Sequence, residues 1–151
     1  MVNVEVGDEA PDFTLPDQEG RPVTLSKLRG KNVVLYFYPK DFSPGCTREA
    51  CDFRDSYEDF TDAGAVVVGV SGDSVESHKR FIDEYKLPFT LLSDMKGEVR
   101  KLYGTYRILG LVSGRYTFII DKEGAIRHVF SSETDMQKHV DEALRVLKEL
   151  K

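Results

Sequence analysis

The chain has 151 residues, of which 40% are hydrophobic and 31% charged, with a formal net charge of −5, two cysteines and no tryptophan. This composition is typical of a globular protein and predicts one domain over residues 1–151. The acidic, mixed-sign charge argues against nucleic acid or a membrane as partner, because both favour a basic patch. The sequence shows no apolar run of the roughly 20 residues that span a bilayer and no secretory leader. We therefore expect a cytoplasmic protein.

The first half of the chain alternates strand and helix patterns. A small hairpin precedes them and turns at residues 17–20, where Gly20 is free to adopt a positive φ. Two nearly continuous apolar runs predict strands buried on both faces, and a helical pattern follows each run. In chain order, these strands and helices occupy residues 32–38, about 44–60, 65–70 and 74–86.

The second half adds a brief strand, a short helix, a hairpin and a final helix. Their predicted ranges are 90–92, 97–103, 116–120 with 125–130, and 136–150. The final helix has one apolar face, with spacings of three and four residues from Met136 to Leu150. Crossover helices between parallel strands, followed by an antiparallel pair, predict an α/β sandwich with a central mixed sheet flanked by helices.

The segment between the first buried strand and its helix carries the clearest chemical signal. Ser43 is expected at the N-cap and Pro44 at the first helical position, which places Cys46 in the first turn. The free amide N–H groups and the helix dipole stabilise a nucleophilic thiolate there. Lys40 and Arg48 add positive charge nearby. The alternatives are that Cys46 is a small buried hydrophobe and that Ser43 only caps the helix.

The second cysteine, Cys51, lies five residues further along the same predicted helix. Helix geometry separates two such Cα atoms by roughly 8–9 Å, whereas a disulfide tolerates at most about 7 Å. Either the two cysteines never bridge, or the start of the helix unwinds during function. Cys51 as a core residue of an amphipathic helix remains the alternative.

The remaining candidate ligands are interpreted as ordinary surface residues. His78 and His139 fall in predicted surface helices and His128 at a polar-facing strand position, so we expect solvated histidines. A zinc site would need a second pair of ligands at metal spacing, which the sequence lacks.

The string from Pro39 to Cys46, Pro-Lys-Asp-Phe-Ser-Pro-Gly-Cys, resembles the Pro-x-x-x-Thr/Ser-x-x-Cys motif of the peroxiredoxins. The longer string from Phe37 to Asp55 is similar to the bacterioferritin comigratory protein or peroxiredoxin Q subfamily. The resemblance extends over the whole chain. It implies a thioredoxin-like fold with an added N-terminal hairpin, in agreement with the order of elements above.

The resemblance also implies an activity. Cys46 matches the peroxidatic cysteine and Cys51 the resolving cysteine, which implies reduction of hydrogen peroxide and organic hydroperoxides through a sulfenic acid and a Cys46–Cys51 disulfide. Thioredoxin or a similar dithiol would then regenerate the enzyme. The implied chemistry needs no metal, haem or flavin cofactor, and the expected assembly is a monomer or a weak homodimer.

Four further residues match positions of the family site. Pro39 would shield the thiolate from water, and the Ser43 hydroxyl would hydrogen-bond the thiolate and the peroxide. Arg115 would hold the thiolate and polarise the peroxide, oriented by Glu49. Position 43 is usually Thr in the family. The serine here keeps the hydroxyl but lacks the methyl group that restricts χ1.

Three other functions stay open. In a one-cysteine peroxidase, Cys51 would be structural and an external thiol would resolve the sulfenic acid. A thiol–disulfide oxidoreductase would usually carry two residues between its cysteines, and this chain carries four. A redox-sensing or holdase domain would use the same fold without catalysis.

Overall fold

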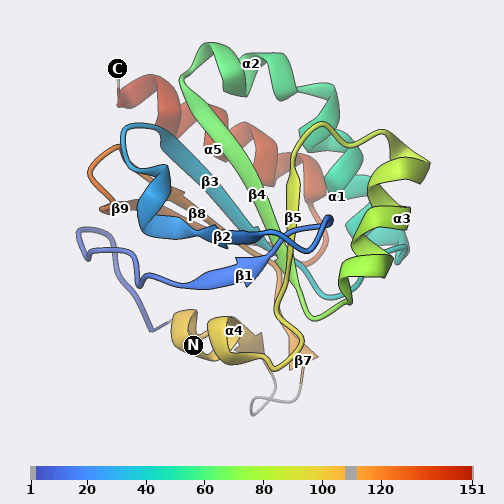
Figure 1. The fold of residues 1–151 in the computed structure, drawn as a ribbon. Helices are drawn as coiled ribbons and strands as arrows, with labels where there is room; N and C mark the ends of the chain where they lie inside the picture. Colours follow the sequence, from blue (N-terminus) through green and yellow to red (C-terminus); the bar gives the residue numbers. More distant parts are fainter. Residues whose placement is uncertain (1–2, 108–111, 151) are drawn as a thin grey trace.

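The computed structural model describes residues 3–107 and 112–150 (Figure 1). Residues 1–2, 108–111 and 151 lie outside this part, so a single domain over residues 1–151 stays a prediction. The elements are β1 Thr14–Pro16, β2 Pro22–Thr24, η1 Leu25–Leu28, β3 Asn32–Phe37, α1 Pro44–Asp55, α2 Tyr57–Asp62, β4 Ala65–Ser71, α3 Val75–Tyr85, β5 Thr90–Ser93, α4 Glu98–Tyr103, β6 Tyr106–Arg107, β7 Val112–Ser113, β8 Tyr116–Ile120, β9 Ile126–Ser131 and α5 Met136–Glu149. In the described residues, no helix is both long and apolar enough to cross a membrane.

A five-stranded mixed sheet in the order β5-β4-β3-β8-β9 forms the centre of the molecule. β3 pairs in parallel with β4, and β4 with β5, whereas β8 runs antiparallel to both β3 and β9. Every residue of β3 is buried, as expected for the middle strand of a sheet covered on both faces. The predicted mixed sheet is therefore confirmed.

Alternate residues of β3 point to opposite faces of the sheet, and the two faces are covered differently. Val34 and Tyr36 belong to the core that α1, α2, α3 and α5 cover, whereas Val33 and Leu35 belong to the core under the N-terminal segment and α4. Figure 1 shows β1 and β2 in front of the sheet and α5 behind it. The α/β sandwich with an added N-terminal hairpin is confirmed.

Two local features differ from the predicted elements. The predicted helix over residues 44–60 is interrupted at Ser56, whose φ of −105° and ψ of 10° separate α1 from α2. The strands β6 and β7 were not predicted, because a strand of two residues is too short to show a hydrophobic period. At the first hairpin, the expected positive φ of Gly20 is confirmed at 79°.

Candidate functional site

The pairing of β3 with β8 brings together two segments that are far apart in the sequence. Phe37, the last residue of β3, lies opposite Tyr116, the first residue of β8. The residue before β8, Arg115, therefore lies where the chain leaves β3 towards α1. Ser43 is the N-cap of α1, with extended backbone angles of −67° and 148°, and Pro44 follows it as predicted.

Cys46 lies in the first turn of α1 and is only 1% exposed. The Nη1 atom of Arg115 donates a hydrogen bond to its Sγ atom over 3.3 Å. Free amide groups at the helix start and a guanidinium at hydrogen-bond distance both favour the thiolate over the thiol. The sulfur therefore lies between the amino end of a helix and a positively charged side chain.

Arg115 is held by both its side chain and its backbone. Its Nη1 atom also donates to Oε1 of Glu49 over 2.8 Å. Its backbone N–H donates to Glu133 over 2.9 Å, and its carbonyl accepts from the Ser131 hydroxyl over 3.1 Å. Burial alone would lower the pKa of Arg115, but the nearby Glu49 and Cys46 raise it on balance. The guanidinium is thus a fixed positive charge above the sulfur.

Gly45 makes room for this guanidinium. A Cβ atom at this position would lie 3.0 Å from Nη2 of Arg115 and 2.9 Å from Cε of Met136. Any larger residue would displace Arg115 or Met136, or both. This requirement was not predicted from the sequence, although a glycine inside a helix is a signal in itself, because glycine destabilises helix interiors.

Glu49 is the second acid–base group of the site and is fully buried. Burial raises its pKa to about 8, against the opposing influence of Arg115. The 2.8 Å contact with Arg115 has the geometry of an ion pair. The raised pKa nevertheless favours a protonated carboxyl at neutral pH, and the second oxygen of Glu49 faces His139.

His139 is buried behind Glu49, with an exposed fraction of 0%. Its Nε2 atom lies 2.8 Å from the Ser132 carbonyl and its Nδ1 atom 2.7 Å from the Thr117 hydroxyl. A carbonyl only accepts, so Nε2 carries the hydrogen, and burial lowers the pKa of the ring, which keeps Nδ1 unprotonated. This bare nitrogen lies 3.6 Å from Oε2 of Glu49.

The prediction of solvated histidines was wrong for both helical residues. His78 and His139 are each 0% exposed, and His128 is half-buried. His139 precedes the buried Ala143 by four residues and thus lies on the apolar face of α5. His78 precedes the buried Phe81 by three residues in α3. The helical spacing was a usable signal, but the polar residue type outweighed it.

The other predicted site residues are placed less closely around the sulfur. The Ser43 hydroxyl donates to the Lys40 carbonyl over 2.8 Å, and Pro39 is half-buried in the loop that follows β3. Cys51 lies further along α1, partly exposed and unpaired with Cys46. Burial raises the pKa of the Cys51 thiol. The structure thus brings together Cys46, Glu49 and Arg115.

A second buried polar cluster fixes the loop before α1. Asp41 accepts from the Tyr38 hydroxyl over 2.6 Å and lies 2.7 Å from Nδ1 of His78, whose Nε2 atom lies 3.0 Å from the Leu92 carbonyl. Asp73 accepts from the backbone N–H of Asp41 over 2.8 Å. Asp41, Asp73 and His78 place one ligand atom each within 4.8 Å of one another. Asp41 and His78 bond to each other, and Asp73 accepts from the Asp41 backbone and the Ser71 hydroxyl, so hydrogen bonds account for the proximity of the three side chains.

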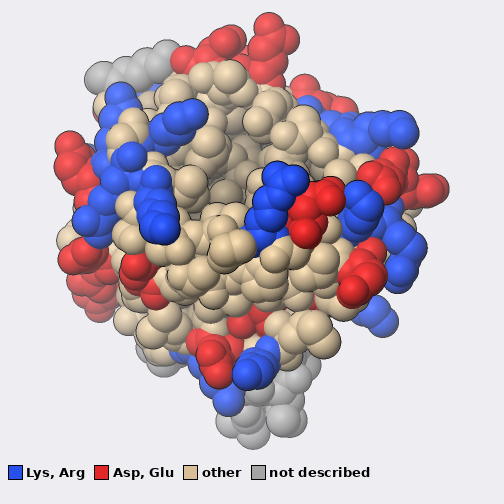
Figure 2. All heavy atoms as spheres, in the orientation of Figure 1, with Lys and Arg blue, Asp and Glu red and all other residues tan. Residues whose placement is uncertain are grey.

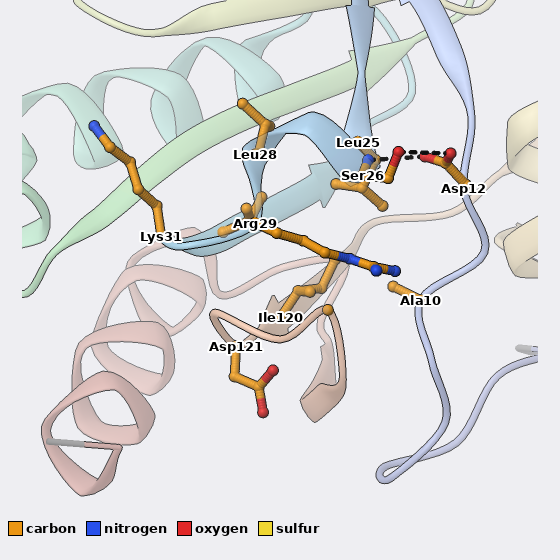
Figure 3. Close-up of a pocket in the computed structure, with 11 residues that line it drawn as sticks. Ala10, Asp12, Leu25, Ser26, Leu28, Arg29, Lys31, Ile120 and Asp121 are labelled. Atoms are coloured by element: carbon orange, nitrogen blue, oxygen red, sulfur yellow. Dashed lines mark hydrogen bonds between the residues drawn. The ribbon is translucent and has the colours of Figure 1, made fainter.

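The small cavity in Figure 3 lies at the other end of the sheet. It has a volume of about 10 Å³ and is lined by residues such as Leu25, Arg29 and Val33, at the start of β3. Such a volume holds about one water molecule. Around the surface seen in Figure 2, basic and acidic side chains are mixed. Neither feature competes with the cysteine site as a reaction centre.

A thioredoxin-like fold that holds a buried cysteine at a helix start beneath an arginine is the arrangement of a peroxiredoxin. Residues 6–129 match the model of the AhpC/TSA family. The chain belongs to this family, and the resemblance to peroxiredoxin Q is confirmed.

Similar proteins and solved structures carry names of the same subfamily. Peroxiredoxin Q, chloroplastic, from Sedum lineare is 56% identical over 152 residues, which cover 100% of this chain and 82% of that protein. Among solved structures, peroxidoxin BcpB from Mycobacterium tuberculosis is 40% identical with a TM-score of 0.92, and 99% of each chain is covered. A bacterioferritin comigratory protein from Xanthomonas campestris, studied for its alkyl peroxide reduction activity, is 31% identical with a TM-score of 0.88 and 99% coverage of both chains. These relatives support thiol-dependent peroxidase activity for the chain.

The cytoplasmic location expected from the sequence is corrected by the same comparison. The relatives from Sedum lineare, Oryza sativa and Arabidopsis thaliana are named chloroplastic, which points to a plastid rather than to the cytoplasm. Composition and fold cannot distinguish these compartments, because cellular addresses are read by receptors rather than encoded in the packed core.

Proposed function

We propose that Cys46 is the peroxidatic cysteine, which attacks hydrogen peroxide or an organic hydroperoxide and becomes a sulfenic acid. The observation that carries this proposal is the 3.3 Å hydrogen bond from Arg115 to the sulfur of Cys46 at the start of α1. The thiolate attacks the peroxide oxygen that bears hydrogen, an S–O bond forms and the O–O bond breaks. Sulfur is oxidised by two electrons, and the second oxygen leaves with the bonding pair.

The surrounding residues have distinct proposed roles in this step. Arg115 stabilises the negative charge that develops on the leaving oxygen, a contribution of the kind that fixed donors make in other active sites. Glu49 positions Arg115 through the 2.8 Å contact. Pro39 limits the access of water, and the Ser43 hydroxyl turns from the Lys40 carbonyl towards the sulfur and peroxide when substrate binds.

An open hollow beside the site supports substrates larger than hydrogen peroxide. It has a volume of about 510 Å³, and Gly45, Arg48 and Met136 are among its lining residues. The hollow adjoins the Arg115 guanidinium, because a Cβ atom on Gly45 would lie 3.0 Å from Nη2 of Arg115 and 2.9 Å from Cε of Met136. The alkyl peroxide reduction activity studied in the Xanthomonas campestris relative is consistent with such substrates.

We propose that Cys51 resolves the sulfenic acid as an intramolecular disulfide and that a thioredoxin-type dithiol reduces it again. Both cysteines lie in the intact helix α1, where helix geometry holds their Cα atoms roughly 8–9 Å apart. A disulfide needs a separation below about 7 Å, so the first turns of α1 must unwind. Local opening of a helix end costs little free energy compared with global unfolding.

The test is the intact mass of the reduced protein after one equivalent of hydrogen peroxide, quenched with a thiol-blocking reagent in denaturant. Loss of two hydrogens with no label on either cysteine would support both proposed roles. A single-oxygen adduct with one labelled thiol would retain the peroxidase but make Cys51 structural.

Two serine variants provide the controls. We expect Cys46→Ser to leave the peroxide unconsumed. We expect Cys51→Ser to consume one equivalent and then to stop without recycling by thioredoxin. Full thioredoxin-linked turnover by Cys51→Ser would contradict the resolving role. Two unoxidised cysteines in the wild type would instead favour the redox-sensing or holdase function.

A further inference from the structure

We propose that Glu49 stores the proton which the reaction at Cys46 requires, and that it then replaces the sulfur as the negative partner of Arg115. This inference rests on the proposed peroxidatic role of Cys46. It gives Glu49 a part in the chemistry, beyond the orientation of Arg115.

The balance of charge limits how many anions this buried site can hold. One nitrogen, Nη1 of Arg115, contacts both the sulfur of Cys46 at 3.3 Å and Oε1 of Glu49 at 2.8 Å. The three residues are between 0% and 6% exposed. A single buried guanidinium compensates one negative charge, and a second anion beside it would remain without compensation. The sulfur and the carboxyl therefore hold one proton between them.

The surroundings of the two Glu49 oxygens indicate where that proton lies. Oε1 of Glu49 accepts from Arg115, whereas Oε2 lies 3.6 Å from Nδ1 of His139, a nitrogen that carries no hydrogen and accepts from the Thr117 hydroxyl. Within the described part of the chain, this buried Oε2 has no hydrogen-bond partner. An ionised carboxylate would thus set two acceptors against each other. A hydrogen on Oε2 removes this repulsion, so we place the shared proton on Glu49.

The other charged or titratable groups near Glu49 do not change this assignment. Burial raises the pKa of Glu49 to about 8, with smaller contributions in the same direction from Glu133 and Asp52. Tyr36 is fully buried, and burial keeps its pKa well above the ordinary value, so it stays neutral. Burial likewise lowers the pKa of His139, so that among the described residues Arg115 is the one positive charge in contact with the carboxyl.

The reaction then proceeds at constant charge in the buried site. The thiolate of Cys46 attacks the hydroperoxide, an S–O bond forms, the O–O bond breaks, and the product is a neutral sulfenic acid. The alkoxide or hydroxide that leaves takes up one proton, and Glu49 gives up one proton once the sulfur no longer carries the charge that Arg115 balances. Before the step, Arg115 balances the sulfur, and after it Arg115 balances the Glu49 carboxylate. Reduction of the later disulfide returns Cys46 as a thiol, whose proton reloads Glu49.

The test counts protons during a single turnover. We would use Cys51→Ser, so that the reaction stops at the sulfenic acid, and mix it with hydrogen peroxide at neutral pH in weak buffer with a pH indicator. The ultraviolet absorbance of the thiolate reports its consumption on the same sample. We expect close to zero protons taken up per thiolate lost, because Glu49 supplies the proton.

Two variants in the same background sharpen the count. Glu49→Gln removes the store, and we expect uptake of close to one proton per thiolate. Asp52→Asn is the matched control, because Asp52 is another α1 acid whose pKa burial raises but pairs with Arg48 instead of Arg115. We expect it to behave like its parent. Uptake of one proton by the parent, or by Asp52→Asn alone, would overturn the proposal.

Infrared difference spectra give a readout that does not depend on the folding of Glu49→Gln. Oxidation of Cys51→Ser should remove a protonated carboxyl band and add a carboxylate band, and unchanged carboxyl bands would overturn the proposal. If the thiolate absorbance itself does not fall with peroxide, the failure lies with the proposed peroxidase role of Cys46, and this inference fails with it.

Discussion

Two buried pairs of histidine and carboxylate lie on either side of the start of α1, and they differ in how completely they are satisfied. His78 and His139 are both 0% exposed. His78 lies 2.7 Å from Asp41, and the remaining atoms of that pair bond to Tyr38, Ser77 and Leu92. His139 lies 3.6 Å from Glu49, whose Oε2 atom has no hydrogen-bond partner among the described residues.

The difference shows that residue types alone do not decide what a buried pair does. A fully satisfied polar network makes a structure rigid, which suits the cluster that holds the loop before Cys46 in place. A buried polar atom without a hydrogen-bond partner costs free energy, and such atoms are found where they have a function. We therefore treat the Asp41 cluster as an anchor and the Glu49 cluster as part of the chemistry.

The largest effect on the rate with peroxide should come from a substitution at Gly45, next to the Arg115 that Glu49 contacts. We expect Gly45→Ala to slow the reaction with peroxide by roughly a hundred- to a thousand-fold, because the added methyl group displaces a guanidinium donor. Its Cβ would lie 3.0 Å from Nη2 of Arg115. The measurement is the rate constant of thiolate loss in stopped flow. Met136→Ala changes the same hollow without a new clash, and an equal loss there would contradict the explanation.

A substitution in the Asp41 cluster should lower the stability of the fold more than the rate of the reaction with peroxide. We expect Asp41→Ala to lower the free energy of unfolding by about 3–5 kcal/mol, since it leaves the buried partners of Asp41 unpaired. The folded fraction should keep most of its rate with peroxide. Urea unfolding and stopped flow on the same samples measure both quantities. Glu49→Ala is the matched variant, and we expect a smaller loss of stability with a larger loss of rate. The reverse pattern would invalidate the contrast.

The pH dependence of the free energy of unfolding should reveal the raised pKa of Glu49. The pKa of Glu49 is raised from 4.5 to about 8 in the folded protein. Between these values the folded state binds more protons than the unfolded state, so this group's contribution to stability falls as pH rises. The contribution is complete below pH 4.5 and lost above about 8. Urea unfolding of the wild type should be steeper in pH than that of Glu49→Gln, and parallel curves would refute the shift.

The smallest effect should lie at Ser43, between the two clusters. Ser43→Thr adds a methyl group that restricts χ1, and we expect the rate constant with peroxide to change by less than about fivefold, equivalent to roughly 1 kcal/mol. The serine hydroxyl donates to the Lys40 carbonyl in the resting structure. Ser43→Ala is the control that removes the hydroxyl. If alanine reacts as fast as serine, the hydroxyl has no part in the step.

The sequence predicted the elements that depend on local patterns. The buried strands 32–37 and 65–71, the N-cap Ser43 and the hairpin of β8 and β9 all follow from apolar runs and turn residues. Arg115 came only from the family resemblance, because its approach to Cys46 depends on the pairing of β3 with β8. No local pattern reveals such a long-range contact.

The missed residues act through packing in three dimensions. Gly45 matters because of the Arg115 guanidinium beside it, a contact between segments that are distant in the chain. His139 lies on the buried face of α5, but a polar residue on an apolar stripe is ambiguous until its partners are known. The break between α1 and α2 at Ser56 could not be predicted either, because the helical hydrophobic pattern continues across it.

The burial of Cys46 also determines which molecules can reach the sulfur. Cys46 is 1% exposed, whereas Cys51 is only partly buried. A bulky alkylating reagent should therefore modify Cys51 of the reduced native protein first, although Cys46 is the proposed nucleophile. Access, rather than intrinsic reactivity, would set this order. The burial of this sulfur would thus spare it from bulky electrophiles, while the terminal oxygen of a hydroperoxide is small enough to approach it.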